Sequence, residues 1–232
     1  MWLVTTYQHT SLFSLRNSSA TSSGGKTNLI PTMYSVKMAL LDAAFRMGLD
    51  VSLEFPWIRD LEIRFEPPEQ AVVNNSFIKI LTEPKDKKAG PAFITSVGFR
   101  EFVFYDGTLK IAVKIENLTQ NHIDKLKLLF FHVNYFGKRG GFLQPICQGI
   151  QEYLGSTFSY FLGENGKFSS DVIMQYLDDM GPKATFPSIN TFDDTAARIG
   201  RDRIMKSVFV PYHQVASSRG YTWFKRESSG SS

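Results

Sequence analysis

The sequence lacks the features that would tie it to an oxidising compartment or to a membrane. Its 232 residues include one cysteine, Cys147, which excludes a disulfide framework and a cysteine-based structural zinc site. No run of about 18 consecutive apolar residues is present, so we expect no membrane-spanning helix. The first residues, Met-Trp-Leu-Val-Thr-Thr-Tyr, lack the charged start and apolar core of a signal peptide, so we expect a cytoplasmic protein.

The sequence also lacks recognisable catalytic and metal-binding patterns. There is no Gly-x-Ser-x-Gly elbow, and the four histidines, His9, His122, His132 and His213, show neither metal-ligand spacing nor a pairing with cysteine. His132 lies on the apolar face of a predicted helix, so we expect it to be buried. We therefore expect no catalytic residues, no metal site and no cofactor.

Two further motifs are incomplete. Gly25-Lys26-Thr27 is similar to the end of a phosphate-binding loop, but that pattern needs a glycine at position 20, where this chain has Ala20. The acidic pairs at 178–179 and 193–194 lack a third ligand, which disfavours a two-metal nuclease site. Nucleotide hydrolysis and metal-dependent cleavage are therefore not favoured.

The composition is that of a folded protein. Hydrophobic residues make up 43% of the chain and aromatic residues 14%, at a net charge of +4. A chain of this length buries about 70–75% of its unfolded surface, so it needs no disulfide or metal for stability. The basic residues are concentrated near the C-terminus. The stretch from Arg198 to Arg226 contains seven Lys or Arg residues and a single acidic residue, Asp202. Such a cluster favours a polyanionic partner, although a solvated surface explains it equally well.

Hydrophobic periodicity predicts a βαββαβ order, which is typical of ferredoxin-like and RNA-recognition-type α+β domains. The expected helices cover about 32–48, where Thr32 can cap the N-terminus, and 119–136, ending at Gly137. The Asp106-Gly107 pair predicts a hairpin between strands 99–105 and 109–115. The remaining strands are expected at 1–8, 61–65 and 142–145.

Other segments are assigned around this domain. Short β-like runs that flank a polar segment predict an inserted hairpin at 71–98, whose basic tip contains Lys85, Lys87 and Lys88. A long mobile loop is expected at 9–30. We place the domain at 1–145 and a C-terminal extension at 146–226, with a helix at 170–180 and a strand at 208–212. Residues 227–232 are expected to form a flexible tail.

The segment Gly137-Lys138-Arg139-Gly140-Gly141 is the best local signal for an anionic ligand. Its glycines allow close approach of a ligand, their N–H groups can face an anion, and its two cations add charge. A helix C-terminus followed by a tight turn explains the same residues equally well. Nearby Tyr135 can stack on a base or pack in the core.

Several of these segments together resemble the repeat-associated mysterious proteins of CRISPR systems, and specifically the fifth Cas protein family. The matching pieces are a strand at the first residue, the helix opened by Pro31-Thr32, Arg100-Glu101-Phe102, and the run from Tyr135 to Phe142. Val208–Tyr212 and Ser218–Thr222 are also similar. The resemblance implies a ferredoxin-like domain with a thumb hairpin, matched here by 71–98, in a prokaryotic cytoplasm.

The resemblance further implies a non-catalytic subunit of a type I Cascade effector complex. Such a subunit binds the 5′ handle of the crRNA, caps a filament of Cas-seven-type backbone subunits, and contacts the large effector subunit near target DNA. Some relatives cleave precursor RNA without a metal, so a ribonuclease remains the alternative, as does a scaffold protein that binds no nucleic acid. The residues expected to bind RNA are Lys26, Lys85, Lys87, Lys88, Arg100, Tyr135, Gly137, Lys138, Arg139, Gly140, Gly141 and Arg219.

Overall fold

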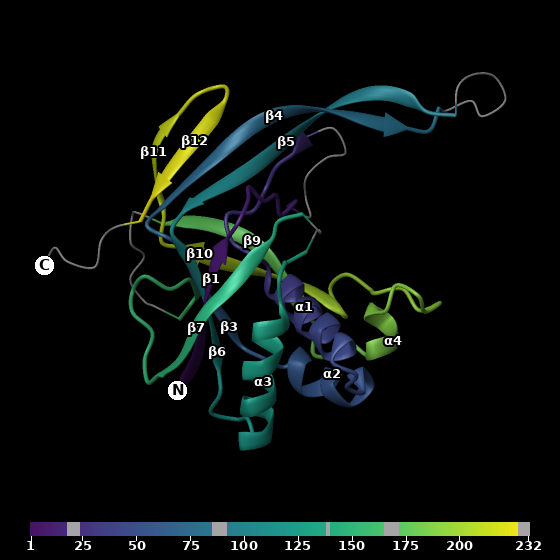
Figure 1. The fold of residues 1–232 in the computed structure, drawn as a ribbon, viewed down its shortest axis with the longest axis vertical. Helices are drawn as coiled ribbons and strands as arrows, with labels where there is room; N and C mark the ends of the chain where they lie inside the picture. The colour runs from purple at the N-terminus through teal and green to yellow at the C-terminus, as the bar shows by residue number, and fades with distance from the viewer. Residues whose placement is uncertain (18–23, 85–91, 138–139, 165–171, 227–232) are drawn as a thin grey trace, which may run out of the picture.

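The computed structural model describes residues 1–17, 24–84, 92–137, 140–164 and 172–226. Its central element is a four-stranded antiparallel sheet in the order β3-β6-β1-β7 (Figure 1). The strands are β1 (Trp2–His9), β3 (Ile63–Glu66), β6 (Thr108–Lys114) and β7 (Leu143–Gln151). Helix α1 (Met33–Arg46) lies between β1 and β3 in the chain, and α3 (Gln120–His132) between β6 and β7. This confirms the predicted α+β, ferredoxin-like topology.

Helix α1 begins where the sequence predicts. Thr32 caps it, because its Oγ1 accepts a hydrogen bond from the Ser35 N–H at 3.0 Å. Gly48 follows the helix end with φ +74°, a conformation that favours glycine. The next helix, α2 (Val51–Arg59), has no counterpart among the predicted elements. It contains Pro56, and a proline is typical of a helix boundary rather than of an interior.

The predicted hairpin at Asp106-Gly107 is wrong. Strand β5 (Ile94–Asp106) pairs with β4 (Gln70–Thr82) along its whole length, whereas β6 pairs with β1 and β3. Gly107, at φ +123°, therefore marks a corner where the chain passes from one sheet into another. The inserted hairpin is accordingly longer than predicted, since each arm has 13 residues and reaches back to the ferredoxin-like sheet.

This hairpin is the centre of a second, five-stranded sheet in the order β11-β12-β4-β5-β2 (Figure 1). β11 (His213–Ser217) and β12 (Tyr221–Lys225) extend it beside β4, and the short β2 (Gly24–Gly25) lies parallel to β5. One face of the hairpin base is buried in the main core through Ala71, Val73, Val103 and Tyr105. The far part of the hairpin leaves the core, and Phe77 and Leu81 there are exposed.

The C-terminal segment forms a third sheet, of three strands in the order β8-β10-β9. The predicted helix at 170–180 is wrong, because the described part of that range is strand β9 (Ile173–Met180). The expected strand at 208–212 corresponds to the end of β10 (Arg203–Val210). β8 (Tyr160–Phe161) is short, and a single-turn helix, α4 (Phe186–Ile189), follows β9. Side chains of β9 and β10 belong to the same apolar core as those of α1.

Near the Gly-rich segment, the structure differs from the prediction in the end of α3, the burial of His132 and the length of β7. Helix α3 ends at His132, not at Gly137, because Val133 has the extended backbone of a strand at φ −81° and ψ 124°. His132 is exposed rather than buried, and its Nδ1 lies 2.9 Å from the Leu128 carbonyl oxygen. β7 continues beyond Pro145 to Gln151, so the proposed boundary at residue 145 falls inside a strand that pairs with β1.

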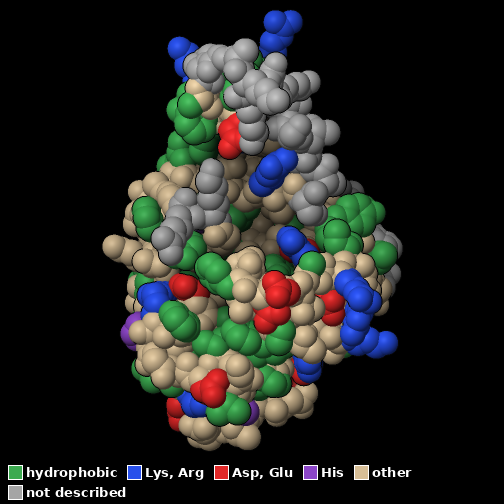
Figure 2. All heavy atoms as spheres, turned by 90° about the vertical axis from the view of Figure 1, so that its right-hand side faces the viewer, with side chains coloured by type: hydrophobic (Ala, Val, Ile, Leu, Met, Phe, Trp, Pro, Cys, Tyr) green, Lys and Arg blue, Asp and Glu red, His purple; other side chains and the backbone are tan. Residues whose placement is uncertain are grey.

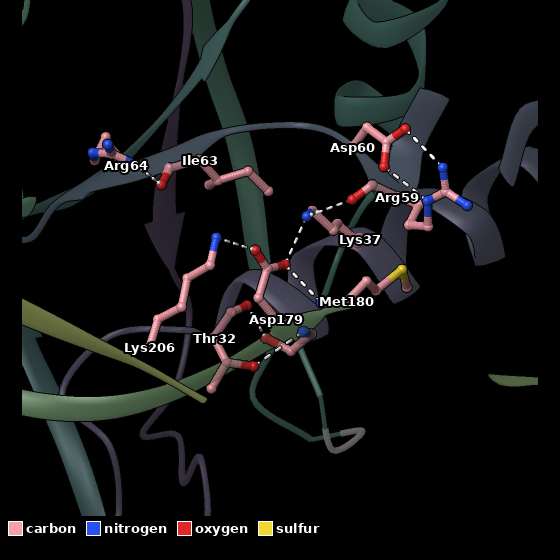
Figure 3. A network of polar contacts seen from close by, with 10 residues as sticks. Thr32, Lys37, Arg59, Asp60, Ile63, Arg64, Asp179, Met180 and Lys206 are labelled. Carbon is pink, nitrogen blue, oxygen red and sulfur yellow. Dashed lines mark hydrogen bonds and ion pairs between the residues drawn. The ribbon is translucent and has the colours of Figure 1, made fainter. Parts of the chain in front are cut away.

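A buried ionic network joins the ferredoxin-like domain to the third sheet (Figure 3). The Lys37 ammonium on α1 donates to Asp179 Oδ1 on β9 at 2.6 Å and to the Arg59 carbonyl oxygen at 2.7 Å. The other carboxylate oxygen of Asp179 accepts from Lys206 Nζ of β10 at 2.9 Å. Burial lowers the pKa of Lys37, an effect that the Asp179 carboxylate opposes.

None of the helices in the described residues is long and apolar enough to cross a membrane.

Candidate nucleic-acid interface

A groove of about 700 Å³ opens between the hairpin, the N-terminus of α1 and the third sheet. Figure 2 shows a hollow on this face of the molecule with Lys and Arg side chains beside it. Its volume is within the range of about 300–1,000 Å³ that is typical of ligand sites. Six parts of the chain line it: residues 12–16, Gly25 and Asn28, the start of α1, the hairpin, the glycines at 137, 140 and 141, and Asp178 with Arg203 of the third sheet.

Two segments of the N-terminal loop, 12–16 and 25–28, border the groove and are held in place by hydrogen bonds. The Phe13 N–H donates to the Val103 carbonyl at 3.1 Å, and the Val103 N–H donates back at 2.7 Å. The Asn28 N–H donates to the Leu15 carbonyl at 2.7 Å, and the Thr27 N–H to Glu101 Oε2 at 2.8 Å. The described parts of the predicted mobile loop at 9–30 are therefore ordered against β5.

Glycines let the walls of the groove approach one another. A Cβ atom on Gly25 would lie 2.6 Å from Arg100 Cδ, and one on Gly141 would lie 2.8 Å from Phe13 Cβ. Gly137 and Gly140 have φ of +69° and +112°, which other residues rarely adopt. The Ser11 hydroxyl donates to the Gly140 carbonyl at 3.2 Å and so ties this loop to the N-terminal one.

Three arginines supply positive charge to the groove: Arg16, Arg100 and Arg203. Arg100 donates from Nη1 to the Phe99 carbonyl at 2.7 Å and, among the described residues, has no carboxylate partner. Arg203 pairs with Asp178 and lies over the Tyr34 ring, 4.6 Å from its centroid. Arg100 is therefore the cation best able to exchange its present contact for an anionic ligand.

The lining also offers aromatic rings and an unsatisfied polar atom. Phe13, Tyr34 and Phe102 line the groove, so flat rings lie close to the cations. Asn28 also lines it, and its side-chain Oδ1 is buried and has no hydrogen-bond partner among the described residues. A buried acceptor is costly unless something donates to it, so this side chain would gain a hydrogen bond if it turned toward a donor in the groove.

The predicted RNA-binding residues fall into three groups. Arg100, Gly137, Gly140 and Gly141 come together in the groove. Three described residues do not line it: Lys26, which is exposed, Tyr135, which is half-buried in a bridge to Phe142, and Arg219, which is exposed in the β11–β12 turn. Lys85, Lys87, Lys88, Lys138 and Arg139 lie outside the described residues.

The groove lining includes residues that are not among the predicted RNA-binding residues. Arg16, Asn28, Tyr34 and Arg203 come from four separate segments. The first three have no signal in the sequence beyond the residue type, whereas Arg203 belongs to the basic cluster at 198–226. The basic cluster at 198–226 does not form an uncompensated patch. Five of its cations have carboxylate partners, four of them from other elements: Arg201, Arg203, Lys206, Lys225 and Arg226.

The histidines are placed away from the groove lining. His9 is stacked on Phe13 with centroids 4.1 Å apart, and both ring nitrogens are buried and have no hydrogen-bond partner in the described part of the chain. Burial lowers its pKa to about 4, so the ring is neutral near pH 7. His122 is stacked on Trp57 at 4.9 Å. His213 is half-buried on β11. No cluster of three or more metal-ligating side chains occurs in the described part of the chain.

The chain was compared with known proteins. No protein-family model matches it. The curated CRISPR-associated protein Cas5 of Archaeoglobus fulgidus is 26% identical over 204 residues, which cover 85% of this chain and 87% of that protein. The crystal structure of a CRISPR protein from Archaeoglobus fulgidus aligns with a TM-score of 0.50 and 10% identity, over 98% of this chain and 92% of that one.

A chain of a CRISPR RNA-guided surveillance complex aligns at a TM-score of 0.48 and 12% identity, over 90% of this chain and 89% of that one. The similarity to Cas5 confirms the family resemblance predicted from the sequence. The solved CRISPR protein confirms the α+β fold class.

Proposed function

We propose that this protein is a non-catalytic, crRNA-binding subunit of a type I CRISPR Cascade complex, and that it holds the 5′ handle of the guide in the groove beside Arg100. The similarity to Cas5 supports membership of a CRISPR effector complex. The observation that carries the finer proposal is the groove itself, which brings arginines, aromatic rings and a Gly-rich loop together from distant segments.

The groove has the chemistry that single-stranded RNA requires. Arg100 and Arg16 can contact phosphates, which supply most of the affinity in such complexes. Phe13 and Phe102 offer faces on which unpaired bases stack. Gly140, where a Cβ atom would meet nothing within 4 Å, lets a ribose–phosphate chain pass close to the protein backbone.

The partners follow from the same proposal. The protein would cap one end of a filament of Cas-seven-type backbone subunits and contact the large effector subunit, close to target DNA. The assembly would function in a prokaryotic cytoplasm. The long β4–β5 hairpin corresponds to the thumb of the family, and its exposed apolar side chains, including Phe77 and Leu81, offer contact area outside the groove.

The groove favours binding over cleavage. Metal-independent RNA cleavage needs a base that can take the 2′-hydroxyl proton near neutral pH. The described lining contains no histidine. His9 lies behind Phe13 with its ring nitrogens buried, so it cannot reach a ligand in the groove without a rearrangement. Tyr34 lines the groove, but burial raises its pKa and disfavours the phenolate.

The test is binding of a repeat-derived RNA to the full chain, measured by fluorescence anisotropy at several salt concentrations in EDTA. Arg100→Ala should weaken binding about tenfold and make the log–log salt dependence shallower by about 0.7 per lost phosphate contact. Lys127→Ala is the matched control, because Lys127 lies on α3 and does not line the groove. Equal affinities and equal slopes for the two variants would refute the groove as the RNA site.

The same mixtures decide between binding and cleavage. Intact RNA after prolonged incubation is the expected result. A single cleavage product that His9→Ala or His213→Ala abolishes would establish the ribonuclease instead.

A further inference from the structure

The outer face of the five-stranded sheet carries a second pocket, distinct from the groove. It has a volume of about 410 Å³ and is lined by Gln70, Ala71, Val72, Phe104, Asp106, Tyr221 and Trp223. None of these residues lines the groove. The pocket spans three adjacent strands, β12, β4 and β5, which the register connects residue by residue.

The strand register shows why aromatic side chains gather here. Val72 is paired with Trp223 on one side and with Phe104 on the other, so the three lie in one row across the sheet. In the next row Asn74 is paired with Tyr221 and Phe102. Side chains in directly paired positions point to the same face, and successive positions on one face lie about 7 Å apart along a strand.

This face is on the opposite side of the sheet from the core. Along each strand, the residues of this face alternate with residues that point to the core. Of the latter, Val73, Val103 and Tyr105 are buried in the main core, and Phe224 packs against that core. The outer face of such a sheet is normally polar. Here, however, Phe104 is 49% exposed and Tyr221 is 41% exposed, and Trp223 is half-buried beside them.

The polar groups around the rings suit nucleobases better than phosphates. Asp106 and Gln70 form the edge of the pocket, and a carboxylate repels phosphate but accepts hydrogen bonds from base amino and imino groups. Cations lie at the two ends of β12 instead. Lys225, whose Nζ also lies 3.7 Å from Glu69 Oε1, is paired with Gln70 in the register, and Arg219 is exposed in the turn before Tyr221. Rings in the middle and cations at both ends match a short stretch of single strand, with bases inward and phosphates outward.

We infer that the outer face of the β12–β4–β5 sheet is a second nucleic-acid site, which stacks unpaired bases on Phe104, Tyr221 and Trp223. A protein partner fits less well, because the carboxylate in the pocket and the two flanking cations would have to be desolvated or paired one by one. Phe102 of the second row also lines the groove, but Phe104, Tyr221 and Trp223 do not. Stacking on these three rings can therefore be tested separately from the proposed handle-binding function.

Trp223 is a natural reporter for this site. In the Trp2→Phe/Trp57→Phe background it is the remaining tryptophan of the three in the chain, and a base stacked on it should quench its fluorescence. The full-length double variant is titrated with short single-stranded oligo(U), oligo(dT) and a matched duplex. Saturable quenching by a single strand and not by the duplex is the expected result, and the two oligonucleotides show whether the site prefers RNA or DNA.

The ring of Tyr221 provides the decisive comparison. Tyr221→Ala should weaken the quenching titration about tenfold, whereas Tyr221→Phe, which keeps the ring, should leave it unchanged. Arg100→Ala should not alter it either, while still weakening groove binding. No quenching, equal quenching by the duplex, an unchanged titration with Tyr221→Ala, or loss of quenching with Arg100→Ala would each overturn the inference.

The same site can be tested without replacing tryptophans if the double variant does not fold. Filter binding of the oligonucleotides to Phe104→Ala in the otherwise unchanged chain should also show about tenfold weaker binding. Phe192→Ala is the control, because Phe192 is 97% exposed and does not line the pocket. Equal binding by these two variants would contradict the inference.

Discussion

The buried ion pair between Lys37 and Asp179 makes a strong prediction about stability. Their side chains are 2% and 4% exposed, and Asp179 also accepts from the Met180 N–H at 2.8 Å and from Lys206. Replacing Asp179 by alanine leaves the Lys37 ammonium buried, with the Arg59 carbonyl as its remaining partner. Removing one member of a buried pair costs about 3–5 kcal/mol of unfolding free energy. For a chain of this size, that corresponds to a decrease in Tm of about 10 °C.

A combined replacement of both charges separates the ion pair from the surrounding packing. Lys37→Met leaves Asp179 with Lys206 and the Met180 amide, so it should cost less than Asp179→Ala. The combined Lys37→Met/Asp179→Leu variant removes both buried charges and replaces them with apolar volume, and it should recover most of the lost stability. Urea unfolding followed by circular dichroism measures all four chains.

The pH dependence supplies a second check on the same group. Burial lowers the pKa of Lys37 in the folded protein below its ordinary value of 10.5. At pH values between the lowered and the ordinary pKa the unfolded chain binds more protons, so stability should rise with pH in that alkaline window. Lys37→Met should lose this rise. A cost below about 1 kcal/mol for Asp179→Ala, or a combined variant as unstable as Asp179→Ala, would refute the reasoning.

Two further predictions concern other parts of the fold. Burial lowers the pKa of His9 to about 4, so as the pH falls the unfolded chain protonates His9 before the folded protein does. The free energy of unfolding should therefore decrease by about 3 kcal/mol between pH 6.5 and pH 4. His9→Phe should make acid unfolding, followed by circular dichroism, less steep; an unchanged acid profile would contradict this. Gly181→Ala should destabilise strongly, because its Cβ would lie 1.9 Å from a backbone carbonyl oxygen, whereas Gly149→Ala meets nothing within 4 Å. Equal Tm values for these two variants would contradict the close approach at Gly181.

The sequence predicts the topology well because the ferredoxin-like core depends on local patterns. The cap at Thr32, the apolar spacing of α1 and the β-forming residues of β1 are all local signals, and the cap, the helix and the strand are found in the structure. The errors arise where pairing partners are distant. Asp106-Gly107 is typical of a hairpin, but which strands pair is decided by burial of Val103 and Tyr105 against the core, which no local pattern shows.

The lining of the groove could be predicted only in part for the same reason. Arg100 is indicated by the family resemblance and the Gly-rich segment by its local composition, and Arg100, Gly137, Gly140 and Gly141 all line the groove. Arg203 belongs to a basic cluster in the sequence, but its neighbours in that cluster are paired with carboxylates that the fold brings from other elements. Asn28 carries no signal in the sequence, since what distinguishes it is a buried oxygen that has no partner among the described residues.

Crosslinking tests the central claim most directly. A repeat-derived RNA containing 4-thiouridine in the handle is irradiated with the full chain, and the crosslinked peptides are identified by mass spectrometry. Binding in the groove predicts crosslinks within residues 12–16 and 100–102, and their loss with Arg100→Ala. Crosslinks confined to α3, or to peptides unaffected by that substitution, would contradict the assignment of this groove as the RNA site.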